Sequence, residues 1–257
     1  MKEKSKKVKY KYKNKKKGFL YKILRCFILC FYRKRKFVGL ENVPQGEPVV
    51  FAGNHCQMHS PMAVELFFPF DKAIWCNGDM MNVKEIPSYA YKDFWSHKPK
   101  GVRWIFKGLS YLLIPIAIVF KSADAIPVYR DLRITNTFKK SIEALGEGCN
   151  IVIFPEKAEG HNNIINDLNL YFVDLAKFYY KSTGKELTFV PMYNAHTLKT
   201  ICFGKPIKFN SKDTIENQRT VICDYMKEEI TSMAKELPSH TVIPFNNVPK
   251  KQYLKSK

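Results

Sequence analysis

Short apolar runs alternate with amphipathic segments along most of the chain, from about residue 38 onward. The runs are rich in Val, Ile and Phe, and they predict β-strands at 47–54, 73–78, 124–130, 149–156, 186–195 and 198–204. The segments between them predict helices at 60–68, 134–145, 167–181 and 213–236. For the helix at 134–145, Thr135 or Asn136 is the expected N-cap and Gly146 the expected stop.

This alternation indicates the fold class. The run at 149–156 has a fully apolar centre, which is typical of a strand with both faces covered. Strands that alternate with helices favour a mostly parallel sheet. We therefore predict an α/β fold: a single domain over 37–245 with a mostly parallel mixed sheet flanked by helices, followed by a basic C-terminal tail at 246–257.

Two segments precede this domain. Residues 1–17 are a lysine-rich block with almost no apolar content, and we expect this tail to be disordered. Residues 18–36 place apolar side chains at steps of three and four between flanking cations, which predicts an amphipathic membrane-associating helix. A helix that packs into the core is the alternative. The apolar part is only about 15 residues long and carries Lys22 and Arg25, so it is too short and too charged for a confident span.

A second apolar stretch lies further along the chain, at 109–120. It is about 12 residues long, shorter than a membrane span, and Pro115 lies inside it. The stretch predicts a core helix or a segment that dips into a membrane.

The composition and net charge of the chain limit the classes of molecule that it is expected to bind. The chain has 257 residues, 46% of them hydrophobic, and a net charge of +20, which calls for an acidic partner. Most of the excess lies in the lysine-rich tail and around the helix at 18–36, and no nucleic-acid-binding signature is present, so we expect anionic membrane lipids and no nucleic acid. The seven cysteines form no paired framework, which favours a reducing compartment. We therefore expect a peripheral or monotopic protein on the cytoplasmic face of a membrane.

Polar residues follow several of the predicted strands. Asn54 and His55 follow the first strand, Arg130 ends the strand at 124–130, and Phe154-Pro155-Glu156 ends the strand at 149–156. Ligands of open α/β sheets gather at the carboxyl ends of strands, so we expect His55, Arg130 and Glu156 to converge on one crevice. His55, Cys56 and His59 are followed by no second ligand cluster, and a metal site is not expected.

The order of these blocks resembles the glycerophospholipid acyltransferase family, typified by the 1-acylglycerol-3-phosphate acyltransferases. The first block supplies Asn54 and His55, the second Arg130, the third Phe154, Pro155 and Glu156, and the fourth Val190-Pro191. The resemblance covers about residues 37–210. It implies the fold of that family and acyl transfer from a thioester, either acyl-CoA or acyl carrier protein, to the free hydroxyl of a lysophospholipid. The expected acceptor is 1-acylglycerol 3-phosphate, and no metal or bound cofactor takes part in the step.

The resemblance also implies roles for individual residues. His55 is the expected general base, because a neutral imidazole titrates near working pH. Arg130 offers forked donors to the acceptor phosphate, and Glu156 helps to order the acceptor site. Asn54, Phe154, Pro155 and Lys157 belong to the expected substrate site.

The chain departs from the family pattern at two points. The Asp expected five residues after the His is Ser60, which could orient a ring nitrogen but carries no charge. Glu65, Glu159 and Asp174 are candidates to replace that carboxylate. The second departure is in the third block, where Lys157 and Glu159 stand at the positions at which the family has Gly and Arg. A catalytically impaired membrane-binding relative of the same fold is therefore the alternative to an active enzyme.

Two further residues lie close to His55 in the sequence. His59 is expected to face water at the start of its helix, with a place in the site as the alternative. A Cys56–His55 nucleophile pair is not expected, because adjacent side chains point apart.

Overall fold

Eight strands pair into one sheet at the centre of the computed structural model, which describes residues 12, 17–82, 84–91, 99–113, 123, 125–129, 131–158, 163–246 and 248–257. The order across the sheet is β1-β7-β6-β2-β5-β3-β4, and β8 pairs with β6 beside β7. The strands are β1 (Lys36–Val38), β2 (Val50–Gly53), β3 (Lys72–Asn77), β4 (Ala125–Val128), β5 (Asn150–Ile153), β6 (Thr188–Ala195), β7 (Thr200–Phe203) and β8 (Ile207–Lys208). β6 runs antiparallel to β7 and β8, whereas β2 is parallel to both β5 and β6. The predicted mostly parallel mixed sheet is confirmed.

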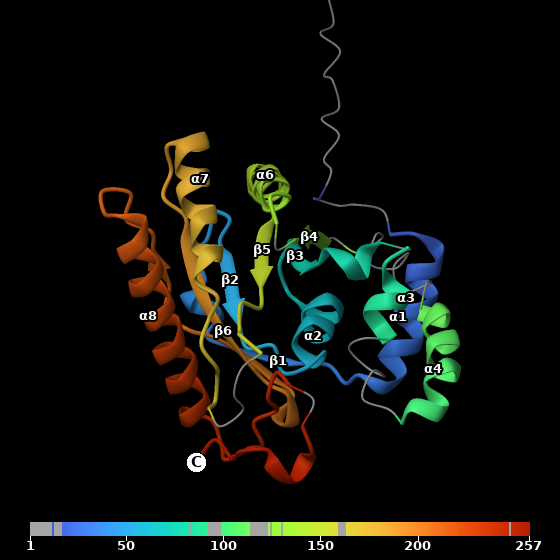
Figure 1. Cartoon of the computed structure of the whole chain (residues 1–257). Helices are drawn as coiled ribbons and strands as arrows, with labels where there is room; N and C mark the ends of the chain where they lie inside the picture. The colour runs from blue at the N-terminus through green and yellow to red at the C-terminus, as the bar shows by residue number, and fades with distance from the viewer. Residues whose placement is uncertain are drawn as a thin grey trace, which may run out of the picture.

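Helices cover both faces of this sheet (Figure 1). They are α1 (Phe19–Phe31), α2 (His59–Phe67), α3 (Ile86–Ala90), α4 (Arg103–Leu109), α6 (Ile134–Gly146), α7 (Asp174–Thr183) and α8 (Ile215–Glu236). Successive residues of a strand point to opposite faces, and the two cores follow that rule. Val50 and Ala52 pack in the core that includes side chains of α6, α7 and α8, whereas Phe51 packs in a second core with Ala63 and Val64 of α2.

One predicted N-cap and one predicted helix start are wrong. α6 begins at Ile134, as predicted, but its N-cap residue is Arg133 rather than Thr135 or Asn136, and the Asp131 carboxylate accepts the Arg133 N–H there at 2.9 Å. α7 begins at Asp174 rather than at 167, because Leu168 forms an isolated β-bridge with Glu156 and keeps the chain extended there. α8 starts directly after Thr214, whose hydroxyl accepts the Asn217 N–H at 3.3 Å.

α1 docks on α2 through polar side chains. The Tyr21 hydroxyl bonds the Glu65 carboxylate, and the Arg25 guanidinium donates to the Leu66 carbonyl at 2.9 Å. Several apolar side chains of α1 are exposed, with Phe19 80% and Phe27 61% accessible, whereas Leu24 and Ile28 are half-buried. Among the described residues, no helix combines the length and apolar character needed to cross a membrane.

Several predictions fall on residues outside the described part of the chain. These include Arg130, Glu159, most of the tail at 1–17 and much of the stretch at 109–120. Within the tail, Tyr12 is described: it is buried, and its N–H donates to Glu147 at 2.6 Å. At the other end, the segment predicted as a basic tail folds back on the residues after α8, since Ser256 is buried and its N–H donates to the His240 carbonyl at 3.0 Å.

Candidate active site

His55 and Glu156 lie together because β2 and β5 are parallel neighbours whose carboxyl ends meet at one edge of the sheet. One Glu156 oxygen accepts the backbone N–H of His55 at 2.8 Å, and the other accepts the backbone N–H of Asn166 at 3.0 Å. Burial raises the pKa of Glu156, and these two N–H groups oppose the shift. Glu156 therefore joins the loop after β2 to the loop after β5, and its hydrogen bond reaches the backbone of His55 rather than the ring.

A tight turn orients the His55 ring. Cys56 and Gln57 both have left-handed backbones, with φ of 50° and 51°, which is strained for residues that carry a Cβ. The turn brings the Gln57 carbonyl back onto Nδ1 of His55. A carbonyl oxygen can only accept, so Nδ1 must carry the proton in the neutral ring and Nε2 must carry the lone pair. Burial lowers the pKa of His55 to about 4, so the ring is neutral at neutral pH.

Ser60 takes part in a different network from the one expected. Asn54 and Asn194 bind each other: the Asn194 N–H donates to Oδ1 of Asn54 at 2.8 Å, and Nδ2 of Asn54 donates to the Asn194 carbonyl at 3.3 Å. The side chain of Asn194 then donates to Oγ of Ser60 at 3.0 Å. Among the hydrogen bonds of the described residues, none joins Ser60 to the His55 ring. Ser60 thus ties α2 to β6, and the Gln57 carbonyl makes the ring contact expected of position 60.

The proposed replacements for the missing carboxylate have other partners. Glu65 forms an ion pair with Lys72 at 3.2 Å as well as its bond to Tyr21, and Asp174 pairs with Arg219 at 2.8 Å. Glu159 lies outside the described residues. The carboxylate that the structure does bring to the His55 loop is Glu156.

The rest of the Phe154–Lys157 block is divided between the site and the surface. The Phe154 ring meets the His55 ring edge-on at 5.7 Å. Pro155 accepts the Asn169 N–H at 2.8 Å, which helps to fix the loop after β5. The Lys157 side chain is exposed, while its backbone carbonyl accepts from Asn166 at 3.2 Å.

The thiol next to His55 is a poor nucleophile. Burial raises the pKa of Cys56 to about 12, and the Glu156 charge contributes in the same direction. The thiol therefore stays protonated at neutral pH, which agrees with the expectation that Cys56 and His55 do not form a nucleophile pair.

The end of β4 is not next to the end of β2, where His55 lies. β5 and β3 separate β2 from β4, which amounts to three strand spacings of about 4.8 Å each. Tyr129 there helps to line a cavity of about 270 Å³ whose other lining residues are Met81, Asn82 and Pro127. Of the three residues expected to converge, the structure brings His55 and Glu156 together, and Arg130 is outside the described residues.

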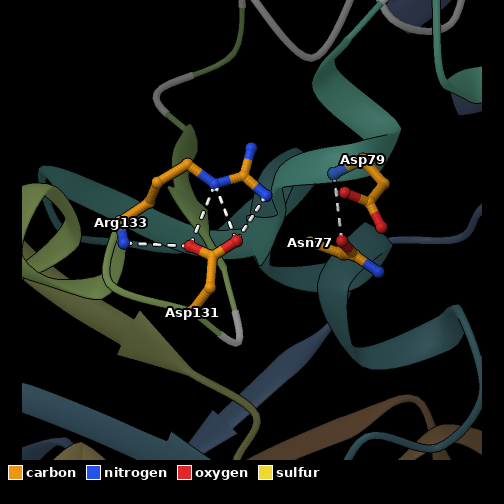
Figure 2. A network of polar contacts seen from close by, with 4 residues as sticks. All are labelled: Asn77, Asp79, Asp131 and Arg133. Carbon is orange, nitrogen blue, oxygen red and sulfur yellow. Dashed lines mark hydrogen bonds and ion pairs between the residues drawn. The ribbon is translucent and has the colours of Figure 1, made fainter.

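Polar contacts fix the backbone next in sequence to the two chain segments that line this cavity. Figure 2 shows the forked ion pair of Asp131 and Arg133 and, separately, the contact in which Asn77 accepts the Asp79 N–H at 3.0 Å. The Arg133 guanidinium also lies 3.8 Å from the centre of the Tyr129 ring. The Arg133 hydrogen bonds lower the pKa of Asp131, so both side chains are charged at neutral pH and form an ion pair with each other.

A second cluster lies beside the site, where α1, β1 and α2 meet the loop after β6. His59 stacks on His196 with ring centres 3.7 Å apart, and its Nδ1 bonds the Tyr32 hydroxyl at 2.8 Å. Arg35 is buried and donates to both Nδ1 and the carbonyl of His196, at 3.0 and 3.1 Å. The expectation that His59 simply faces water is wrong, because the ring is held in this cluster.

Sequence reasoning missed the residues that surround His55 from distant parts of the chain. Phe245 lies over the imidazole with ring centres 4.1 Å apart, and Tyr253 accepts a hydrogen bond from Gln57 at 2.9 Å. Asn194 carried a readable signal, since a polar residue inside an apolar strand needs a buried partner. Phe245 and Tyr253 carried none, because nothing local to them indicates a contact almost 200 residues earlier in the chain.

The chain was compared with known proteins. No protein-family model matches it, and no curated protein is significantly similar in sequence. Among solved structures, it is similar in fold to the crystal structure of the 1-acyl-sn-glycerophosphate (LPA) acyltransferase PlsC from Thermotoga maritima, with a TM-score of 0.50. The match has 14% sequence identity and covers 83% of this chain and 78% of that chain. At this identity the likeness concerns the fold: a mostly parallel sheet flanked by helices, as in that enzyme.

Proposed function

We propose that this protein is an acyltransferase that moves an acyl group from a thioester to the free hydroxyl of a lysophospholipid. The expected acceptor is 1-acylglycerol 3-phosphate, and the donor is acyl-CoA or acyl carrier protein. One observation carries the proposal: the Gln57 carbonyl holds Nδ1 of His55, which leaves Nε2 as a base at the carboxyl end of β2. The fold shared with the Thermotoga maritima enzyme supports the same interpretation.

The chemistry follows from this ring. Nε2 of His55 takes the acceptor's hydroxyl proton while the hydroxyl oxygen attacks the thioester carbonyl. The tetrahedral intermediate then releases the thiolate, which takes the proton back from the imidazolium, so the ring returns to its starting state. Arg130, two residues after β4 in the sequence, is the proposed contact of the acceptor phosphate.

Loss of the family's aspartate has a cost in this mechanism. The imidazolium forms in a buried place where the pKa of His55 is already lowered to about 4. The Gln57 carbonyl orients the ring but brings only a dipole, so it stabilises the transient cation less than a carboxylate would. We therefore expect a slower enzyme than one in which a carboxylate holds Nδ1 of the histidine.

The surface of the protein suits a membrane-delivered acceptor. α1 directs Phe19, Ile23 and Phe27 outward, and α4, on the same side of the molecule, exposes Trp104 by 73% next to Lys107 (Figure 1). Apolar side chains interleaved with cations are typical of helices that lie in the interface of an anionic bilayer. We propose that this side of the protein rests on the cytoplasmic face of a membrane and that the acceptor enters from there.

A direct assay tests the function. The purified protein is incubated in mixed micelles with labelled 1-acylglycerol 3-phosphate and either acyl-CoA or acyl carrier protein, beside His55→Ala and the control His59→Gln. Diacyl product from the wild type and the control, with a loss of at least about 100-fold in His55→Ala, supports the proposal. Equal activity in His55→Ala contradicts the role of His55.

One observation favours a second candidate. Phe245 covers the His55 ring, and the aspartate is missing, so the chain could be a catalytically impaired membrane-binding relative. A wild type that forms no product with any acceptor of a lysophospholipid panel, yet binds anionic vesicles, supports this alternative.

A further inference from the structure

The segment after α8 is anchored deep in the sheet rather than trailing from it. Residues 238–246 and 248–257 are called the C-terminal segment. His240 is buried, and its Nε2 bonds the hydroxyl of Tyr193, a buried residue of β6, at 2.8 Å. The other ring nitrogen of His240 lies 2.8 Å from the Pro238 carbonyl and 3.0 Å from the Ser256 hydroxyl. Both ends of the segment are therefore fixed at one buried ring.

From this anchor the C-terminal segment reaches the candidate active site at three points. The Phe245 ring packs on the His55 ring, with centres 4.1 Å apart and planes inclined by 32°. The Gln57 side chain donates to the Tyr253 hydroxyl at 2.9 Å and to the Asn246 carbonyl at 3.4 Å. The Asn246 side chain in turn bonds the Ala158 carbonyl, in the loop that follows Glu156.

Two of these contacts are made by Gln57, whose carbonyl orients the His55 ring. The His55 tautomer depends on where the Gln57 carbonyl points, and that direction depends on two successive left-handed residues. A strained turn persists only where its surroundings hold it. Gln57 has a long side chain, and its amide is held by the C-terminal segment.

We infer that the C-terminal segment is part of the candidate active site: through Tyr253 it holds the Gln57 turn, whose carbonyl fixes the ring tautomer of His55. Gln57 and Tyr253 are thus positioning residues that act through His55. The catalytic consequence rests on the proposed function, whereas the effect on the tautomer does not.

The tautomer can be measured without any substrate. Long-range ¹H–¹⁵N correlation spectra of the full chain report which imidazole nitrogen carries the proton, and His55→Ala assigns the signal among the six histidines. For the wild type we expect the proton on Nδ1 of His55. In Tyr253→Phe we expect a clear rise in the form protonated on Nε2, because the Gln57 amide loses its shorter hydrogen bond and keeps only the longer one to the Asn246 carbonyl.

Matched variants separate this effect from general loosening. Tyr225→Phe removes a tyrosine hydroxyl that donates to the Lys205 carbonyl at 3.1 Å, away from the site, and is expected to leave the tautomer unchanged. Gln57→Met removes the hydrogen bond to the Tyr253 hydroxyl from its other end, together with the one to the Asn246 carbonyl, so it should shift the tautomer at least as far as Tyr253→Phe. The double variant Gln57→Met/Tyr253→Phe is expected to behave like Gln57→Met, because that single change already breaks the bond to Tyr253.

Activity gives a second readout. If the enzyme acts as proposed, Tyr253→Phe lowers kcat by about 3- to 10-fold, the worth of one neutral hydrogen bond, and leaves KM within about twofold. A wild-type tautomer signal in both Tyr253→Phe and Gln57→Met overturns the inference. A protein that shows the tautomer shift but no acyl transfer keeps the inference and removes the proposed function instead.

Discussion

The Ser60 side chain contacts Asn194 and does not contact the His55 ring that it was expected to orient. Its Oγ accepts from Asn194, which is bound to Asn54 directly before His55. The hydroxyl therefore stabilises the packing of α2 against β6, and the ring gets its orientation from Gln57. We propose that Ser60, a candidate catalytic residue by its place in the motif, has a structural role.

Replacing Ser60 by Ala tests this assignment. The change leaves the buried Asn194 amide without its acceptor, so we expect the free energy of unfolding to fall by about 1–3 kcal/mol. Because no hydrogen bond joins Ser60 to the His55 ring in the described structure, kcat should stay within about threefold of wild type. Urea unfolding and the micelle assay measure the two quantities.

Ser141→Ala is the matched control, since the Ser141 hydroxyl is equally buried and accepts from the Trp75 indole at 2.9 Å, away from His55. Both variants should lose stability to a similar extent. A large loss of kcat in Ser60→Ala, with none in Ser141→Ala, would return Ser60 to the catalytic machinery.

At the scale of elements, the cluster of Tyr32, Arg35, His59 and His196 joins the segment between α1 and β1 to α2 and to the loop after β6. Burial, followed by the charges of His59 and Arg35, lowers the pKa of His196 to about 4, and burial and Arg35 lower the pKa of His59. Both rings therefore bind fewer protons in the folded chain than in the unfolded chain, where histidine titrates near 6.5. Their contribution to stability is complete above about pH 6.5 and is lost as the pH falls towards 4.

The stacked histidines thus predict a weakness in mild acid. Between about pH 7.5 and about pH 5 we expect His196 to remove about 1 kcal/mol from the free energy of unfolding, a value reduced for its partial exposure. His196→Phe keeps an aromatic ring but does not titrate, so its stability should fall less over the same range. Urea unfolding at both pH values measures the difference, and an equal fall in the two proteins would show that other groups, such as His55, carry the effect.

Element positions were largely readable from the sequence, and the remaining errors come from contacts between residues that are distant in the sequence. The Val- and Ile-rich runs predicted the strands, because a two-sided apolar core admits few other residues. The start of α7 was misplaced because Leu168 pairs with Glu156, a contact that no window around residue 167 contains. Strand order was beyond reach for the same reason, and it decides that β4 lies three positions from β2.

On the scale of the whole molecule, charge and exposed apolar area meet on the side that carries α1 and α4. Polar side chains of α1 bind α2, and Phe19, Ile23 and Phe27 of the same helix are exposed, the reverse of a helix that packs into a core. The net charge of +20 adds long-range attraction to an anionic bilayer, in which each lysine near the surface is worth about 1 kcal/mol. Membrane association stays a prediction that vesicles can test.

Phe19→Gln/Ile23→Gln should weaken binding to anionic vesicles by at least about tenfold, because each side chain would otherwise bury apolar area worth about 2 kcal/mol. The fold should be unaffected, since both side chains are exposed. Val221→Gln on α8 also replaces an exposed apolar residue and should bind like wild type. Co-sedimentation at low and high salt measures binding, and equal affinity of all three proteins would exclude α1 as the docking element.

The contact between Gln57 and Tyr253 spans 196 residues of sequence, and this separation has a consequence for folding. Contacts so distant in sequence form late, because the closure entropy of a long loop must first be met by the rest of the sheet. A chain whose sheet has formed but whose last residues have not docked would hold His55 in an unrestrained turn. In that intermediate the imidazole would lie open to water and exchange freely between its two tautomers, so the candidate base would be completed in the last step of folding.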